Sequence, residues 1–230
     1  MNFIDSGSHK IAYEHIPGQG VGVMMLLGHK SYMSKSSKAK HIKSLCIESG
    51  VPYTAFDYAG YGQSSGETGL WLTDQWLINT MDVMDHVIKH PTILVGNSMG
   101  GFFMLMAALC RPQLVHSLVG ICPGFGSYFQ TTGRQEIRHG NVEIQIGFER
   151  KPIDYHFLNQ KLIIDKPIRL IHGLDDELVP AKSSLNIAEK ISSTDVQIHY
   201  LKGCGHSLEQ PHVIPIVWRY ITELRELQAV

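Results

Sequence analysis

The fold of this chain is decided by one short stretch of sequence, Thr92-Ile93-Leu94-Val95-Gly96-Asn97-Ser98-Met99-Gly100. The first four residues are apolar or β-branched, which favours a buried strand. The next five have the pattern G-x-S-x-G, and the apolar residues Phe102–Cys110 that soon follow favour a central helix. The stretch therefore predicts a strand that turns sharply into a helix, with Ser98 at the turn.

Similar apolar runs recur on both sides of this unit. They predict strands at Lys10–His15, Val21–Leu27, Val51–Asp57, Thr92–Val95, Leu114–Cys122, Ile168–His172 and Val196–Leu201. Helical periodicity lies between some of these strands, at Asp74–Lys89, and again near the C-terminal end. This alternation predicts the α/β class: a doubly wound, mostly parallel sheet of about eight strands with helices on both faces.

One interval is longer than the others. Gly124–Lys166 separates two predicted strands, has no long periodic pattern and is rich in aromatic residues. Insertions of this length are commonly functional, and the aromatic content argues against disorder. We therefore expect one domain spanning residues 1–230, in which 124–166 forms a small lid; a surface excursion packed on the core is the alternative.

Charge and composition exclude several classes of function. The 230 residues carry 20 Lys and Arg against 21 Asp and Glu, so a nucleic acid or an anionic membrane is not expected as the main partner. No apolar run reaches the roughly 18 residues of a membrane span. The first ten residues lack a signal pattern and the four cysteines lack CxxC spacing, so we expect a cytoplasmic protein with free thiols.

Ser98 is the predicted nucleophile. A strand–turn–helix context exposes the central hydroxyl of G-x-S-x-G, and Gly96 and Gly100 occupy positions where a Cβ would clash with neighbouring chain. The backbone N–H of Met99 then begins a helix and is predicted to stabilise an oxyanion. A small-residue turn without reactivity is the alternative.

A serine of ordinary acidity needs a base, and the base needs an acid that orients it. In this type of fold the order along the chain is Ser, then Asp or Glu, then His. Asp176 lies in the loop after Ile168–His172 and is the predicted acid, with Asp175 as its nearest substitute. His206 follows the last predicted strand between a glycine-rich loop and the final helix, and is the predicted base.

The second oxyanion donor is expected from the loop after Val21–Leu27, where the backbone N–H of His29 is the candidate. No cofactor or metal is expected. The glycines of Gly60–Gly66 lack the spacing of a dinucleotide-binding turn. His86 and His90 share a helix face with two aspartates, but without an HExxH motif.

Together the elbow at Ser98, the acid loop at Asp176 and the histidine loop at His206 resemble the α/β-hydrolase superfamily over nearly the whole chain. Phe56–Gly66 resembles the loop that precedes the elbow strand in this family. Gly28, Ser31, Met33 and Lys38-Ala39 are similar to a small-lid branch of bacterial hydrolases that includes the mitochondrial acyl-protein thioesterase type. This chain departs from that branch at His29 and Tyr32 and has one extra residue before Lys38.

The predicted function is a serine hydrolase that cleaves a carboxylic ester or thioester through an acyl-enzyme on Ser98. The aromatic lid segment favours a small-molecule substrate with an apolar acyl or aryl part. A peptidase or amidase with the same triad is one alternative. A non-hydrolytic ligand-binding module of the same fold is another, because a fold does not determine a function.

Overall fold

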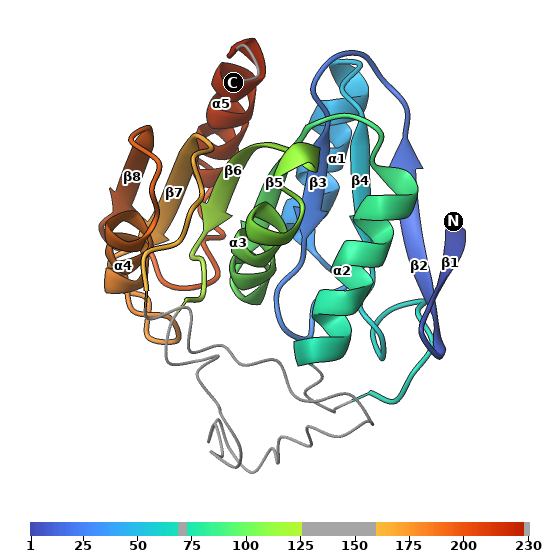
Figure 1. Ribbon diagram of the computed structural model, residues 1–230. Coiled ribbons are helices and arrows are strands. Elements are labelled where there is room, and N and C mark those ends of the chain that lie inside the picture. The colour runs from blue at the N-terminus through green and yellow to red at the C-terminus, as the bar shows by residue number, and fades with distance from the viewer. Residues whose placement is uncertain (69–72, 126–159, 228–230) are drawn as a thin grey trace.

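A sheet of eight strands runs through the computed structural model, which describes residues 1–68, 73–125 and 160–227 (Figure 1). The strands are β1 (Asn2–Ser6), β2 (His9–Ile16), β3 (Val23–Leu26), β4 (Tyr53–Phe56), β5 (Thr92–Asn97), β6 (Val115–Ile121), β7 (Ile168–Gly173) and β8 (Val196–Leu201). Their order across the sheet is β1-β2-β4-β3-β5-β6-β7-β8. The pairs β1–β2 and β2–β4 are antiparallel and the others are parallel, which confirms the predicted sheet.

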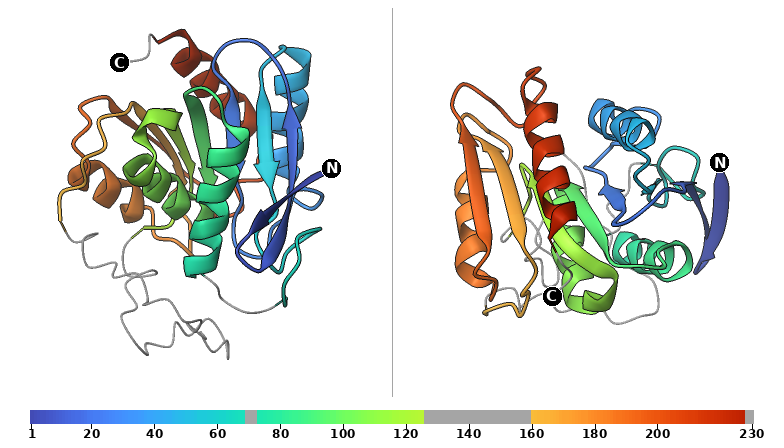
Figure 2. Two further views of the ribbon diagram at one scale, coloured as in Figure 1. Left: turned by 45° about the vertical axis from the view of Figure 1, so that its right-hand side comes forward. Right: turned by 90° about the horizontal axis from the view of Figure 1, so that it is seen from above.

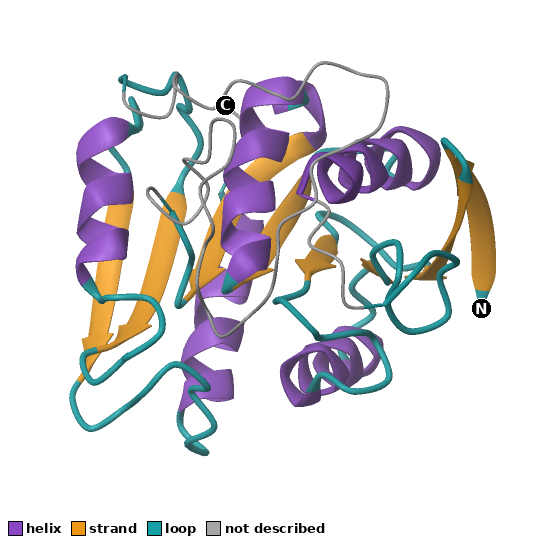
Figure 3. Ribbon diagram, turned by 90° about the horizontal axis from the view of Figure 1, so that it is seen from below, coloured by secondary structure: helices purple, strands orange, loops and turns teal. Residues whose placement is uncertain are grey.

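Helices cover both faces of this sheet (Figures 2 and 3). One face carries α1 (Ser37–Glu48) and α5 (Val213–Glu226), and the other carries α2 (Thr73–Val87), α3 (Met99–Cys110) and α4 (Lys182–Lys190). A single 3₁₀ turn, η1 (Pro112–Leu114), leads from α3 into β6. Because both faces are covered, every residue of β3, β4 and β6 is buried.

The strand β1 was not predicted from the sequence. Its residues Asn2, Asp5 and Ser6 are poor strand formers, and the strand is largely exposed at the edge of the sheet. What holds it is pairing with β2, in which Phe3 lies opposite Ala12. The other strand predictions were correct in position, with ends that differ by one or two residues.

The predicted lid range, Gly124–Lys166, is described only at its two ends. Most of the predicted lid, residues 126–159, lies outside the described residues. At the end of the predicted lid range, Leu162 and Ile164 are buried and the Leu162 N–H donates to the Lys190 carbonyl at 2.7 Å, and the lid itself stays a prediction.

The parallel strands all end at the same edge of the sheet, at the bottom of Figure 1. The loops that follow β3, β5, β7 and β8 therefore meet there, and they carry the residues singled out from the sequence. Within the described part of the chain, no helix has the length and apolar character needed to cross a membrane.

Candidate active site

Ser98 lies at the sharp turn between β5 and α3. Its backbone has φ 54° and ψ −119°, a conformation that L-residues rarely adopt. The Ser98 N–H donates to the Ile121 carbonyl at 2.9 Å, which ties the turn to β6. A Cβ on Gly96 would lie 2.6 Å from the Gly100 carbonyl oxygen, and one on Gly100 would lie 2.1 Å from the Leu26 carbonyl oxygen. Both glycines are therefore required by close backbone packing, as predicted.

The hydroxyl of Ser98 is available for chemistry. Ser98 precedes the first residue of α3, where a serine commonly caps the helix with its own oxygen, yet it makes no such bond. Its Oγ lies 2.8 Å from Nε2 of His206 instead. The strained backbone thus directs the hydroxyl to a base rather than to the helix.

Asp176 follows β7 and is buried. Its Oδ1 accepts the backbone N–H groups of Leu178 and Val179 at 3.0 and 2.8 Å. Burial by itself raises the pKa of this carboxyl. The Val179 N–H, His206 and the Cys122 thiol outweigh it, so the pKa of Asp176 lies below its ordinary value. The group is therefore an anion at neutral pH.

His206 joins the acid to the nucleophile. Its Nδ1 lies 2.7 Å from Asp176 Oδ2, while its Nε2 faces Ser98. Asp176 holds the Nδ1–H tautomer, which leaves Nε2 as the acceptor for the serine proton. The structure thus brings Ser98, Asp176 and His206 together, whereas the alternative acid Asp175 is exposed and uses its backbone N–H to bind the Cys204 carbonyl.

His172 was missed as a site residue. It is the next-to-last residue of β7 and is fully buried, and its Nε2 lies 2.9 Å from the Val179 carbonyl oxygen and 3.2 Å from Asp176 Oδ2. Its Nδ1 accepts the Ser184 hydroxyl at 2.7 Å. Burial lowers the pKa of His172, so it is a neutral donor beneath the acid loop. A histidine near the end of a predicted buried strand, four positions before the predicted acid, was the available signal.

Cys122 is the other neighbour of the acid. This buried residue has φ 42°, its thiol donates to Asp176, and burial raises its pKa to about 12. One ligand atom each from Cys122, Asp176 and His206 lies within 4.8 Å of the others, the kind of grouping that can hold a metal ion. Hydrogen bonds between the acid and its two partners already account for this grouping, so the absence of a metal stays a prediction.

The loop after β3 lies directly against the nucleophile turn. A Cβ on Gly28 would lie 3.3 Å from Cβ of Ser98, so the backbone of His29 begins beside the serine. Met99 is the first residue of α3, as expected of an N–H that faces an oxyanion. Met99 and His29 stay predicted oxyanion donors.

Asp57 holds this loop in position. Its Oδ1 accepts the Met33 N–H at 2.6 Å and its Oδ2 accepts the Gln63 N–H at 2.9 Å. Gly62 has φ 54°, and a Cβ there would lie 1.9 Å from Asp57 Oδ2. The glycine-rich loop that resembles a dinucleotide-binding turn thus packs around a buried carboxylate and supports the predicted oxyanion loop.

Aromatic rings line the same side of the site. The His29 ring centroid lies 6.3 Å from the centroids of both Tyr61 and Trp76, which are themselves 5.4 Å apart. Trp76 donates its indole N–H to the Ala59 carbonyl at 2.9 Å. The surroundings of the predicted oxyanion loop are therefore rigid and largely apolar.

Comparisons with known proteins agree with this geometry. The family model described as the alpha/beta hydrolase fold matches residues 33–137. The chain is 28% identical to the palmitoyl-protein thioesterase ABHD10, mitochondrial, of Pongo abelii, over 93% of this chain and 76% of that protein.

Solved structures give the same result. Alpha/beta hydrolase domain-containing protein 10 from mouse superposes with a TM-score of 0.81 at 26% identity, covering 97% of each chain. A putative hydrolase from Agrobacterium vitis S4 has a TM-score of 0.79 at 24% identity, covering 98% of this chain and 97% of its own, and supports the fold alone. The sheet order, the serine at the strained turn and these similarities lead to one conclusion: the chain has the fold of the α/β-hydrolase superfamily and is a hydrolase.

Proposed function

We propose that this hydrolase cleaves a carboxylic ester or thioester through an acyl-enzyme on Ser98. The observation that carries the proposal is the continuous line of hydrogen bonds from Asp176 through His206 to Ser98, at 2.7 and 2.8 Å. A line of this kind lets a hydroxyl of ordinary acidity act as a nucleophile, because the proton has an acceptor already in place.

The geometry supports the following steps. Ser98 Oγ attacks the carbonyl carbon while its proton passes to His206 Nε2, and Asp176 stabilises the imidazolium that forms. The backbone N–H groups of Met99 and His29 bind the oxyanion. Collapse of the tetrahedral intermediate expels the alcohol or thiol, which takes the proton from His206. Water, activated by the same histidine, then attacks the acyl-enzyme and releases the carboxylic acid.

The relatives favour a thioester substrate. They are named palmitoyl-protein thioesterases, and the aromatic surroundings of His29, Tyr61 and Trp76 suit an apolar acyl or aryl group. A thiolate is also a better leaving group than an alkoxide, so the barrier to cleavage at the same site is lower for a thioester. The names of these relatives include the word mitochondrial. A cytoplasmic location remains our proposal, and fractionation of the producing cells tests it.

The experiment is intact-mass analysis after incubation with a fluorophosphonate. We expect one covalent adduct on the wild type and none on Ser98→Ala, while the control Ser34→Ala, at an exposed serine, labels like the wild type. Turnover of Ser98→Ala on a reactive ester should fall by about three orders of magnitude or more.

A substrate series then separates the alternatives. Matched thioesters, esters and anilides of rising chain length are compared by kcat/KM, and we expect thioester and ester turnover well above anilide turnover. Preferred anilide cleavage would favour the peptidase or amidase. A missing adduct on the wild type, together with tight ligand binding, would favour the non-hydrolytic module.

A further inference from the structure

A half-buried lysine lies beside the loop of the base. Lys38 is the second residue of α1, whose first turn contains no acidic side chain. A cation is unfavourable there, because the first turn of a helix carries the positive end of the helix dipole.

The ammonium of Lys38 is directed across the site. It donates a hydrogen bond to the backbone carbonyl oxygen of Ser207, 169 residues away in sequence. Burial lowers the pKa of Lys38, and the nearby Cys122 and Glu209 act in the opposite direction. A hydrogen bond from a charged donor is stronger than one between neutral groups, so this contact stabilises the position of the Ser207 carbonyl.

The carbonyl that it binds belongs to the residue next to His206. The loop before His206 is attached to the acid loop, since the Asp175 N–H donates to the Cys204 carbonyl at 3.0 Å. After His206 the loop turns with a longer bond, 3.3 Å from the Leu208 N–H to the Gly205 carbonyl. Lys38 therefore supports the less constrained side of this loop.

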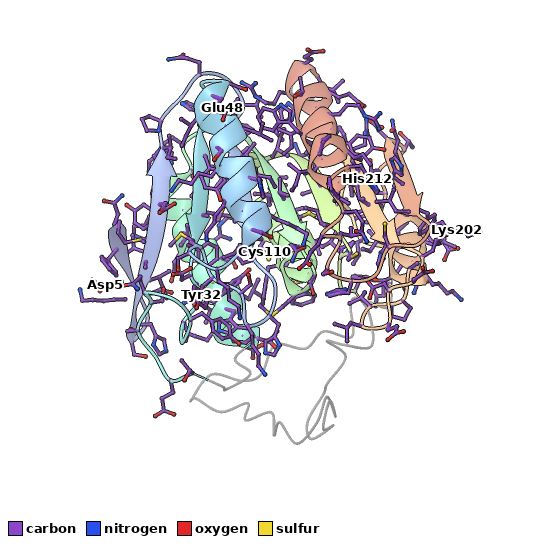
Figure 4. The ribbon with its side chains drawn as sticks, turned by 180° about the vertical axis from the view of Figure 1, so that it is seen from behind. Asp5, Tyr32, Glu48, Cys110, Lys202 and His212 are labelled. Carbon is purple, nitrogen blue, oxygen red and sulfur yellow. The ribbon has the colours of Figure 1, made fainter. Side chains whose placement is uncertain are left out.

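The helices α1 and α5 lie side by side in Figure 4. The label of Glu48 marks the C-terminal end of α1, and the label of His212 marks the N-terminal end of α5. The beginnings of α1 and α5 thus face the same edge of the sheet, and each directly follows a loop of the site. Lys38 is the side chain that joins these two loops, one carrying the predicted oxyanion donor His29 and the other carrying His206.

We propose that Lys38 is a positioning residue of the hydrolase: its ammonium holds the histidine loop so that His206 Nε2 stays aligned with Ser98 Oγ. This inference rests on the proposed function. It concerns the rate of proton transfer and not substrate binding, because Lys38 acts through the backbone of Ser207. Small displacements of a catalytic group lower rates far more than they lower affinities.

The test compares Lys38→Met, which keeps the apolar stem, with Lys38→Arg, which restores the charge and the donor. Lys40→Met is the matched control, since Lys40 is exposed on the same helix. For Lys38→Met we expect kcat and the rate of fluorophosphonate labelling to fall about tenfold or more with KM unchanged. Lys38→Arg should recover most of the loss, and Lys40→Met should match the wild type.

The outcomes separate this inference from the proposed function. A wild type that fails to label contradicts the serine hydrolase itself. A wild type that labels, together with a Lys38→Met variant of equal kcat and labelling rate, overturns the role of Lys38. A rise in KM alone also overturns it. If Lys38→Met does not fold, Lys38→Gln replaces it, and failure of both to fold would make Lys38 a structural residue only.

Discussion

The nucleophile turn and the acid–base pair meet at the same edge of the sheet but are held in different ways. Ser98 is held by backbone: its N–H bonds Ile121, and Gly96 and Gly100 allow the chain to approach within contact distance. Asp176 and His206 depend on side chains as well: His172, four residues before the acid, and Lys38, from a distant segment. The turn is thus held by backbone contacts, and the acid–base pair needs side-chain partners in addition.

This difference predicts different responses to substitution. A turn held by backbone contacts leaves no room for an added atom, because displacing a packed strand or helix costs much free energy. A pair held by side chains tolerates added atoms but depends on each partner. The following predictions test this contrast, beginning with the largest effect.

Gly100→Ala should damage the molecule most. The new Cβ would lie 2.1 Å from the Leu26 carbonyl oxygen in β3, and neither backbone can yield. We expect a loss of about 3 kcal/mol or more in the free energy of unfolding, measured by urea denaturation, and little activity in any folded fraction.

The matched control is Gly205→Ala, next to His206. The nearest atom to its added Cβ is the Asp175 carbonyl oxygen at 3.6 Å, an ordinary contact. Its free energy of unfolding should change by less than about 1 kcal/mol. Equal losses in the two variants would contradict the contrast between a backbone-held turn and a side-chain-held pair.

His172→Leu should have an intermediate effect. It removes the partner of the Ser184 hydroxyl and of the Val179 carbonyl and withdraws a donor from Asp176. We expect about 2 kcal/mol less stability and a kcat lower by about tenfold to a hundredfold, measured by denaturation and steady-state kinetics.

His199→Leu is the control for this histidine. His199 lies in β8, away from the acid loop, and contacts Tyr220 through a long hydrogen bond of 3.4 Å and an edge-on ring contact. Its kcat should match the wild type. A normal kcat in His172→Leu would show instead that the acid loop does not need its contacts with His172 for activity.

The pH dependence of stability gives the smallest effect. The pKa of Asp176 lies below its ordinary value of 3.8, so the ionised group stabilises the folded state above that pH. This contribution is lost as pH falls through the lower folded pKa. Between the two values, unfolding free energy should fall by up to about 1.4 kcal/mol per pH unit more steeply in the wild type than in Asp176→Asn. Parallel slopes in denaturation from pH 5 to pH 2 would contradict this.

Much of the fold could be predicted from sequence. The buried parallel strands are continuous apolar runs, so their positions follow from composition alone. The edge strand β1 could not, because its polar residues become a strand only by pairing with β2. The burial of Leu162 and Ile164, at the end of the predicted lid Gly124–Lys166, could not be predicted for a similar reason, since Leu162 bonds to Lys190 at the end of α4.

The residues of the site also divide into those that could be predicted from the sequence and those that could not. Ser98 was identified by residues that are its immediate neighbours, and chain order selected Asp176 and His206. His172, Cys122 and Lys38 carried no local motif, and their relation to the acid and the base appears only when β7, β6 and α1 are brought to one edge.

The sequence by itself determined the class of sheet, the strained turn and the order of the three predicted catalytic residues. These depend on steric rules and hydrophobic periodicity, which act over a few neighbouring residues. Only the tertiary structure decided which acid faces the histidine and which distant side chains hold the pair. The physical reason is that hydrogen bonds and burial depend on distance in space, and a chain of 230 residues brings together groups as far apart as Lys38 and Ser207.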